Sequence, residues 1–177
     1  MRASGHRSAV FRCSGGLTLS IFDEEKSGWA MTERQKLIAH KRTVLYTKAR
    51  LQQMTGIEVI KIFEQSEPEA LNEIYSAYAS SAYSYDFEPY SRLPYDSSEM
   101  KVYSWIITVM GLKEGAEYFF HCDLWVQIRI QNLQLAVQSL WHGNNFLLVE
   151  TNFSRVLEAG FDSRDEENYL IDIWERI

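Results

Sequence analysis

The sequence predicts an α+β fold: a mainly antiparallel sheet of five to six strands with two or three helices on one face. The first observation behind this prediction is the strict alternation of apolar and polar residues over 117–130, which is the period of a strand. The second is the recurrence of apolar residues every three or four positions over 33–54, 69–78 and 133–141, the period of amphipathic helices. The third is a set of short polar turns near the C-terminus, typical of an antiparallel meander. The expected order is α-β-α, a long loop, then β-β-α-β-β-β.

The first helix is expected to begin after Thr32, because Thr32 and Gln35 have the spacing of a capping box, and to end before Gly56. Its apolar stripe is expected to contain Leu37, Ile38, Val44, Leu45 and Leu51. Lys41 and Lys48 fall in the same stripe, so they either extend along its edge to solvent or mark where a partner's carboxylates arrive. A short β-branched strand over 57–63 and the second helix follow.

Residues 79–100 form a segment rich in Ser, Tyr, Pro and Asp in which no period survives, and we expect a long loop there. Its tyrosines include Tyr83, Tyr85 and Tyr90. Tyrosine rings supply rigid contact area at low entropic cost, so the segment has the composition of a binding loop. The alternative is a loop that packs its own tyrosines onto the body of the protein.

From 103 onward the pattern is regular. We expect a strand over 103–110, a turn, and the alternating stretch 117–130, which exceeds the usual strand length and predicts a bulge or break near Asp123. Asn132 is placed to cap a helix, and three strands over 146–151, 155–161 and 169–174 complete the chain. With the helices gathered on one side, the other face of the sheet is expected to be available.

The length of 177 residues and an apolar content of 46% predict one domain over 31–177. Residues 1–30 read as a flexible leader or a misassigned start, with Met31 as the alternative first residue. The N-terminus lacks the apolar core of a secretory signal, and no apolar run approaches the roughly 20 residues that span a bilayer. Cys13 and Cys122 are expected to be free thiols, which favours a soluble, cytoplasmic protein.

The charge of the chain is divided along its length. Residues 1–60 carry ten Lys and Arg against five Asp and Glu, whereas residues 61–177 carry eight against nineteen. Single-sign surfaces steer association with a charged partner. Nucleic acid would have to bind the basic first helix while the acidic body repels it, so a protein partner is favoured.

His121 and Asp123 are weak catalytic candidates, because alternation projects both from one side of a strand and an imidazole and a carboxylate then converge. The alternative is a partly exposed histidine hydrogen-bonded by its acidic neighbour. The spacings of structural zinc sites, EF-hands and phosphate loops are absent, and Cys122 falls on the apolar side. We therefore expect no metal and no cofactor.

These observations favour a small protein-binding protein of the inhibitor or immunity-protein type, which acts by occluding a basic toxin or enzyme through an acidic, aromatic surface. The expected binding residues are Tyr83, Tyr85, Tyr90, Phe119, Trp125, Arg129, Asp165, Glu166 and Glu167. The first alternative is a small hydrolase or metal-dependent enzyme centred on His121 and Asp123. The second is a nucleic-acid adaptor that uses the basic first helix.

Overall fold

The computed structural model describes residues 31–82, 87–143, 145–161 and 164–176. Within these residues the protein is α+β, with four α-helices and one antiparallel sheet of seven strands. The predicted class is therefore confirmed, and the expected five to six strands and two or three helices each fall short of the count. The expected leader, 1–30, lies outside the described residues.

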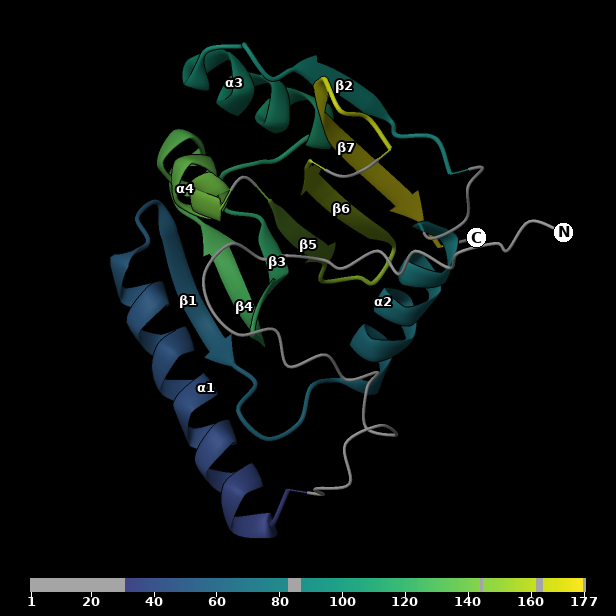
Figure 1. Ribbon diagram of the computed structural model, residues 1–177. Helices are drawn as coiled ribbons and strands as arrows, with labels where there is room; N and C mark the ends of the chain where they lie inside the picture. The colour runs from purple at the N-terminus through teal and green to yellow at the C-terminus, as the bar shows by residue number, and fades with distance from the viewer. Residues whose placement is uncertain (1–30, 83–86, 144, 162–163, 177) are drawn as a thin grey trace, which may run out of the picture.

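The first two strands of the chain, β1 and β2, form the opposite edges of the sheet, and the last strand, β7, lies next to β2 (Figure 1). Every neighbouring pair of strands is antiparallel. From edge to edge the strands are β1 (Ile57–Ile62), β4 (Leu124–Ile130), β3 (Glu117–Cys122), β5 (Phe146–Glu150), β6 (Arg155–Gly160), β7 (Asn168–Glu175) and β2 (Ser91–Pro94). The expected C-terminal meander is confirmed as β5-β6-β7.

The alternating stretch 117–130 is a tight hairpin. The break expected near Asp123 is the turn itself, where Asp123 adopts a φ of 61° and Cys122 pairs with Leu124. Because the turn is centred on one residue, even-numbered residues pair with even-numbered ones, as Tyr118 does with Ile128. The two faces predicted by the alternation therefore continue through the turn.

One face of the sheet carries the larger hydrophobic core. Tyr118, Phe120 and Ile128 point into it, where α1 (Glu33–Gln53), α3 (Glu99–Met110) and α4 (Leu133–Leu140) cover the sheet. The α4 helix begins as predicted, because the Asn132 side chain accepts a hydrogen bond from the amide of Leu135 at 3.0 Å.

The opposite face is covered by α2 (Glu69–Ala82), which lies across the sheet from α3 and α4 (Figure 1). The expectation that the helices share one face and leave the other available is therefore wrong. Phe119 and Trp125 stand on this second face and are only 6% and 5% exposed, because Ile74 and the rest of the apolar side of α2 pack over them. An amphipathic helix buries its apolar side where large apolar side chains are already gathered.

The segment expected to form a strand over 103–110 belongs to α3. Its buried residues are Val102, Tyr103, Ile106 and Met110, which follow the helical spacing. A short apolar run rich in β-branched residues does not distinguish a strand from a buried helix. The end of the run identifies it as a helix, because Gly111 takes a left-handed φ of 65° and its amide donates a hydrogen bond to the carbonyl of Ile107, as at a helix C-terminus.

The first helix buries only part of the expected apolar stripe. Val44 and Leu51 are buried as predicted, Thr47 is buried with them, and the Thr47 hydroxyl donates to the carbonyl of Cys122 at 3.2 Å. Leu37, Ile38 and Leu45, expected in the core, are 54%, 43% and 68% exposed. The capping box of Thr32 and Gln35 is confirmed. Among the described residues, none of the helices has the length and apolar content that a membrane span needs.

Gly56 is expected to be irreplaceable. It has a φ of +75°, and an added Cβ would stand 2.3 Å from the amide nitrogen of Ala136 and 2.7 Å from the carbonyl oxygen of Asn132. Gly111 has a similar φ of +65° with no neighbour within 4 Å of an added Cβ. Gly111→Ala should cost about 1–2 kcal/mol, the conformational penalty alone, and Gly56→Ala at least about 2 kcal/mol more. Urea unfolding of both variants measures the difference, and equal losses would contradict the close approach.

Cys122 is expected to resist thiol reagents until the protein unfolds. Its side chain is 2% exposed, and burial raises the pKa of the thiol to about 12. In a Cys13→Ser variant the remaining thiol should react slowly in buffer and at once in denaturant. Fast labelling of the native variant would mean that the β3 register is inverted, since a one-residue shift exchanges the two faces.

Candidate functional site

The sheet ends in a short edge strand, β2, which pairs with β7 through Ser91 with Ile171 and Pro94 with Asn168. This strand lies within the segment 79–100 that was expected to be a loop. The sequence did not reveal it because β2 has four residues and ends in Pro94. Proline is confined to the edges of sheets because it donates no ladder hydrogen bond.

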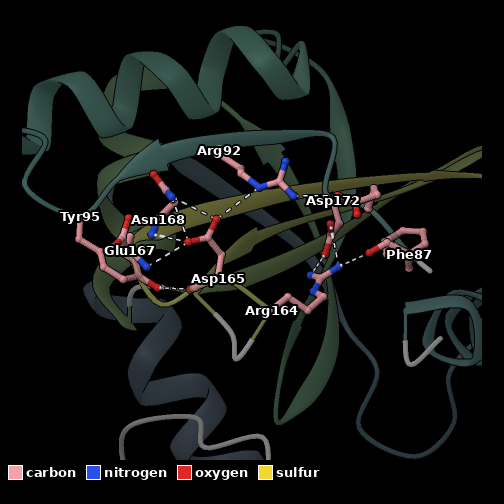
Figure 2. A network of polar contacts seen from close by, with 9 residues as sticks. Phe87, Arg92, Tyr95, Arg164, Asp165, Glu167, Asn168 and Asp172 are labelled. Carbon is pink, nitrogen blue, oxygen red and sulfur yellow. Dashed lines mark hydrogen bonds and ion pairs between the residues drawn. The ribbon is translucent and has the colours of Figure 1, made fainter. Parts of the chain in front are cut away.

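Beside β2, the turn before β7 is fixed by Asp165 (Figure 2). One carboxylate oxygen accepts hydrogen bonds from the backbone amides of Glu167 and Asn168 at 3.0 and 3.1 Å, and Arg92 of β2 lies 3.3 Å from the other. The Glu167 amide, followed by the Asn168 side chain, holds the pKa of the Asp165 carboxyl below its usual value. The Tyr95 hydroxyl donates to the carbonyl of Asp165 at 3.1 Å. The turn is thus tied to both flanks of β2.

A second ion pair lies deeper in the same edge. Arg164 donates to the carboxylate of Asp172, which is only 3% exposed, and to the carbonyl of Phe87 at 3.3 Å (Figure 2). Glu158 of β6 is the cross-strand partner of Asp172 and accepts a hydrogen bond from the Tyr78 hydroxyl of α2. Burial, and then the charges of Glu158 and Asp172, raise the pKa of Tyr78. Two neighbouring carboxylates are thereby held by a tyrosine from the helix and an arginine from the turn.

We call residues 87–99 and 164–172 the acidic edge. They contain seven carboxylates against two arginines, a net charge of −5. Several of these carboxylates are bound internally, but Glu166 and Glu167 are exposed and make no ion pair within the part of the chain that the structure describes. Tyr90 comes immediately before β2, at the end of the strand away from Glu167, and is 67% exposed.

The structure brings four of the predicted binding residues to this edge, namely Tyr90, Asp165, Glu166 and Glu167. Phe119 and Trp125 lie elsewhere, in the core beneath α2. Tyr83 and Tyr85 lie outside the described residues. The ion pairs of Arg92 with Asp165 and of Arg164 with Asp172 were not predicted; the signal for them was arginines spaced among carboxylates in β2 and in the turn before β7, the strand that β2 pairs with.

Arg129 lies near the opposite edge of the sheet. It is the cross-strand partner of both Glu58 and Glu117, and its guanidinium is 2.8 Å from the first carboxylate and 2.6 Å from the second. Hydrogen bonding to Arg129 holds the pKa of Glu117 below its usual value. A charge pair directly across a ladder stabilises the sheet. Arg129 therefore forms ion pairs with residues of both neighbouring strands, and its own strand, β4, is five positions away from β2 in the sheet.

His121 and Asp123 stand at the tip of the β3–β4 hairpin. The His121 ring stacks on Tyr75 at 5.8 Å and meets the edge of Trp125 at 4.8 Å, while part of the residue remains exposed. Loss of hydration among these rings lowers the pKa of His121, and the charges of Asp123 and Glu67 oppose that shift. Within the described residues, no three His, Cys, Asp or Glu side chains are grouped as metal ligands.

A hollow of about 370 Å³ lies between α2 and the end of β7. Its lining includes Ser81, which accepts a hydrogen bond from the Trp174 indole at 3.2 Å, and the ion pair of Glu73 with Arg176 at 3.6 Å. His121 and Asp123 are not among its lining residues. The hollow therefore does not supply a pocket for the predicted catalytic pair.

Trp125→Ala and Tyr90→Ala should separate core from surface. Trp125→Ala is expected to lower the free energy of unfolding by about 3–5 kcal/mol, the cost of a large cavity. Tyr90→Ala should change it by less than about 0.5 kcal/mol, because its side chain stands in solvent. Chemical unfolding followed by circular dichroism measures both. An undiminished stability of Trp125→Ala would return Trp125 to the candidate binding surface.

The pKa of His121 is expected to lie below its ordinary value of 6.5 in the folded protein. An unfolded chain then binds the proton more readily, so this contribution to stability is complete above about pH 6.5 and is lost as pH falls below it. NMR titration of the His121 ring measures the pKa directly. Stability measured from pH 8 to 5 should fall less in His121→Gln than in the parent, and a pKa above 6.5 would contradict the cause.

Comparison with protein-family models, with curated proteins and with solved structures gives no match to this chain.

Proposed function

We propose that this protein is a small protein-binding protein of the inhibitor or immunity-protein type, which acts by occluding a basic site on its partner. The observation that carries the proposal is the acidic edge, where exposed carboxylates and Tyr90 stand on a frame of internal hydrogen bonds.

The frame favours binding because it is already ordered. The Asp165 turn is held by backbone amides, and its ion pair with Arg92 anchors it to β2. A preordered surface loses little conformational freedom when a partner binds. Glu166 and Glu167 remain free to meet cations, and the exposed Tyr90 at the other end of β2 has the character of an interface anchor.

The acidic edge also keeps its own electrostatic field. The basic helix α1 packs against β4, the neighbour of the edge strand β1 at the other side of the seven-stranded sheet. Five strand spacings of about 4.8 Å put β4 and β2 roughly 24 Å apart, which exceeds the screening length of about 8 Å at physiological ionic strength. The two charged regions therefore do not neutralise one another, and the acidic edge is suited to steer a basic partner.

The enzyme alternative rests on His121, whose pKa is lowered by loss of hydration although the carboxylates of Asp123 and Glu67 oppose that shift. A neutral imidazole is suited to accept a proton. Its two nearest rings, Tyr75 and Trp125, make it equally a packed histidine at the edge of the second core. We rank this alternative second because His121 does not line the hollow between α2 and the end of β7.

The proposal is tested by affinity capture from the native host with three immobilised full-length baits. The parent is compared with Glu166→Gln/Glu167→Gln and with the control Glu67→Gln/Glu69→Gln, which makes the same charge change on exposed residues at the start of α2. A specific partner should be retained by the parent and the control, and its affinity for the acidic-edge variant should fall at least about tenfold. The loss should lie mainly in the association rate and should shrink with added salt.

Tyr90→Ala should weaken the same partner by about 2 kcal/mol, the scale of an interface anchor. Equal affinity for all baits would refute the acidic edge as the binding surface. Turnover of a substrate that is abolished in His121→Gln would instead establish the enzyme.

A further inference from the structure

The first half of α1 stands away from the body of the protein. The helix has 21 residues and is about 31 Å long, whereas β1, which runs beside it, has six residues and spans about 20 Å. Figure 1 shows α1 continuing past the end of β1. From Glu33 to Arg42 every residue except Ala39 is exposed.

This projecting part carries a defined pattern. Arg34, Ile38, Lys41 and Leu45 follow one another at spacings of four, three and four, so they form a single row along the helix. All four are exposed, and Leu45 reaches 68%. We call this row the α1 seam. It alternates basic and apolar residues on the side away from the buried Val44, Thr47 and Leu51.

The cations of the α1 seam are not neutralised by carboxylates of the described residues. Lys36 and Lys48 pair with Glu33 and Glu64, and Arg50 lies over the ring of Phe120. Arg34 and Lys41, by contrast, make no ion pair with any other residue that the structure describes, nor does the neighbouring Arg42. The helix as a whole carries six basic residues against Glu33, a net charge of +5.

The order of residues in the seam distinguishes its possible occupants. A second copy packed through the same seam would gather four cations and supply no carboxylate to them. A lipid surface favours a continuous apolar face with cations at its border, but Lys41 lies between Ile38 and Leu45. Nucleic acid would meet Ile38 and Leu45 where phosphates need cations. An acidic helix satisfies both residue types, because its carboxylates meet the cations and its apolar residues cover the apolar ones.

We propose that the α1 seam is a docking site for an acidic amphipathic helix of another protein, with apolar residues seven apart to match Ile38 and Leu45 and a carboxylate three or four residues from each of them to match Arg34 and Lys41. This surface is separate from the acidic edge, since the two lie at opposite edges of the sheet. Its success or failure is therefore independent of the proposed function.

The probe is a fluorescein-labelled synthetic helix with leucine every seventh residue and glutamate at the intervening contact positions, titrated with the full-length protein. Binding is expected, weakening with added salt. Lys41→Gln and Leu45→Ser should each raise the dissociation constant at least about tenfold. Two controls make the same changes elsewhere: Lys36→Gln on another side of α1 and Leu135→Ser, a 43% exposed leucine on α4. Both should leave the dissociation constant within about twofold of the parent.

Three further measurements test the other possible occupants of the α1 seam. These are binding to phosphatidylserine–phosphatidylcholine vesicles, binding to a 20-base-pair DNA, and a dimer in sedimentation velocity, each lost in Lys41→Gln or Leu45→Ser. Any of them, with no binding of the acidic helix, would assign the seam to a membrane, a nucleic acid or a second copy. Absence of helix binding, or equal binding by Lys41→Gln and Lys36→Gln, would also overturn the proposal.

Discussion

The structure depends on one constraint, the division of the β3–β4 hairpin into two apolar faces. Phe119 and Phe120 are adjacent in the chain and enter different cores, the first beneath α2 and the second beneath the other helices. The turn at Asp123 preserves this division, because it pairs residues of the same parity across the hairpin. Had the turn contained one more residue, the two faces of one strand would be exchanged, and its more polar side would face the larger core. Both helical layers are therefore positioned by a single turn residue in a left-handed conformation.

Closing both faces determines which surfaces remain for a partner. The face that holds Phe119 and Trp125 is removed from solvent by α2, so binding has to use the edges of the sheet or the outer sides of the helices. The strand order then separates the charges, with α1 beside β1 at one edge and the acidic turn beside β2 at the other. A charge division that is sequential in the chain becomes spatial in the fold, and each end presents a surface of one sign.

Sequence periodicity was sufficient to predict an element where the local preference of its residues agrees with their tertiary packing. The two faces of 117–130, the Asn132 cap of α4 and the C-terminal meander could all be predicted from periodicity and turn residues, whereas the hairpin turn at Asp123 was expected only as a bulge or break. The α3 helix could not, because its β-branched run favours a strand locally and only packing against the core selects the helix. Phe119 and Trp125 occupy the polar phase of an alternating stretch, so their burial depends on α2, a helix remote in sequence. Likewise, Arg92 and Asp165 are brought together only by the pairing of β2 with β7.

The α2 helix closes the second face of the sheet as part of the folded core, and native-state hydrogen exchange of the full chain measures whether it does so. If α2 is part of the closed core, its amides over 71–78 should open with a free energy within about 1 kcal/mol of those in β3 and β4, since cooperative units exchange together. If α2 amides exchange with an opening free energy several kcal/mol lower, the helix is a separable cover. Phe119 and Trp125 would then be accessible to a partner, and the account that places binding at the edges would be contradicted.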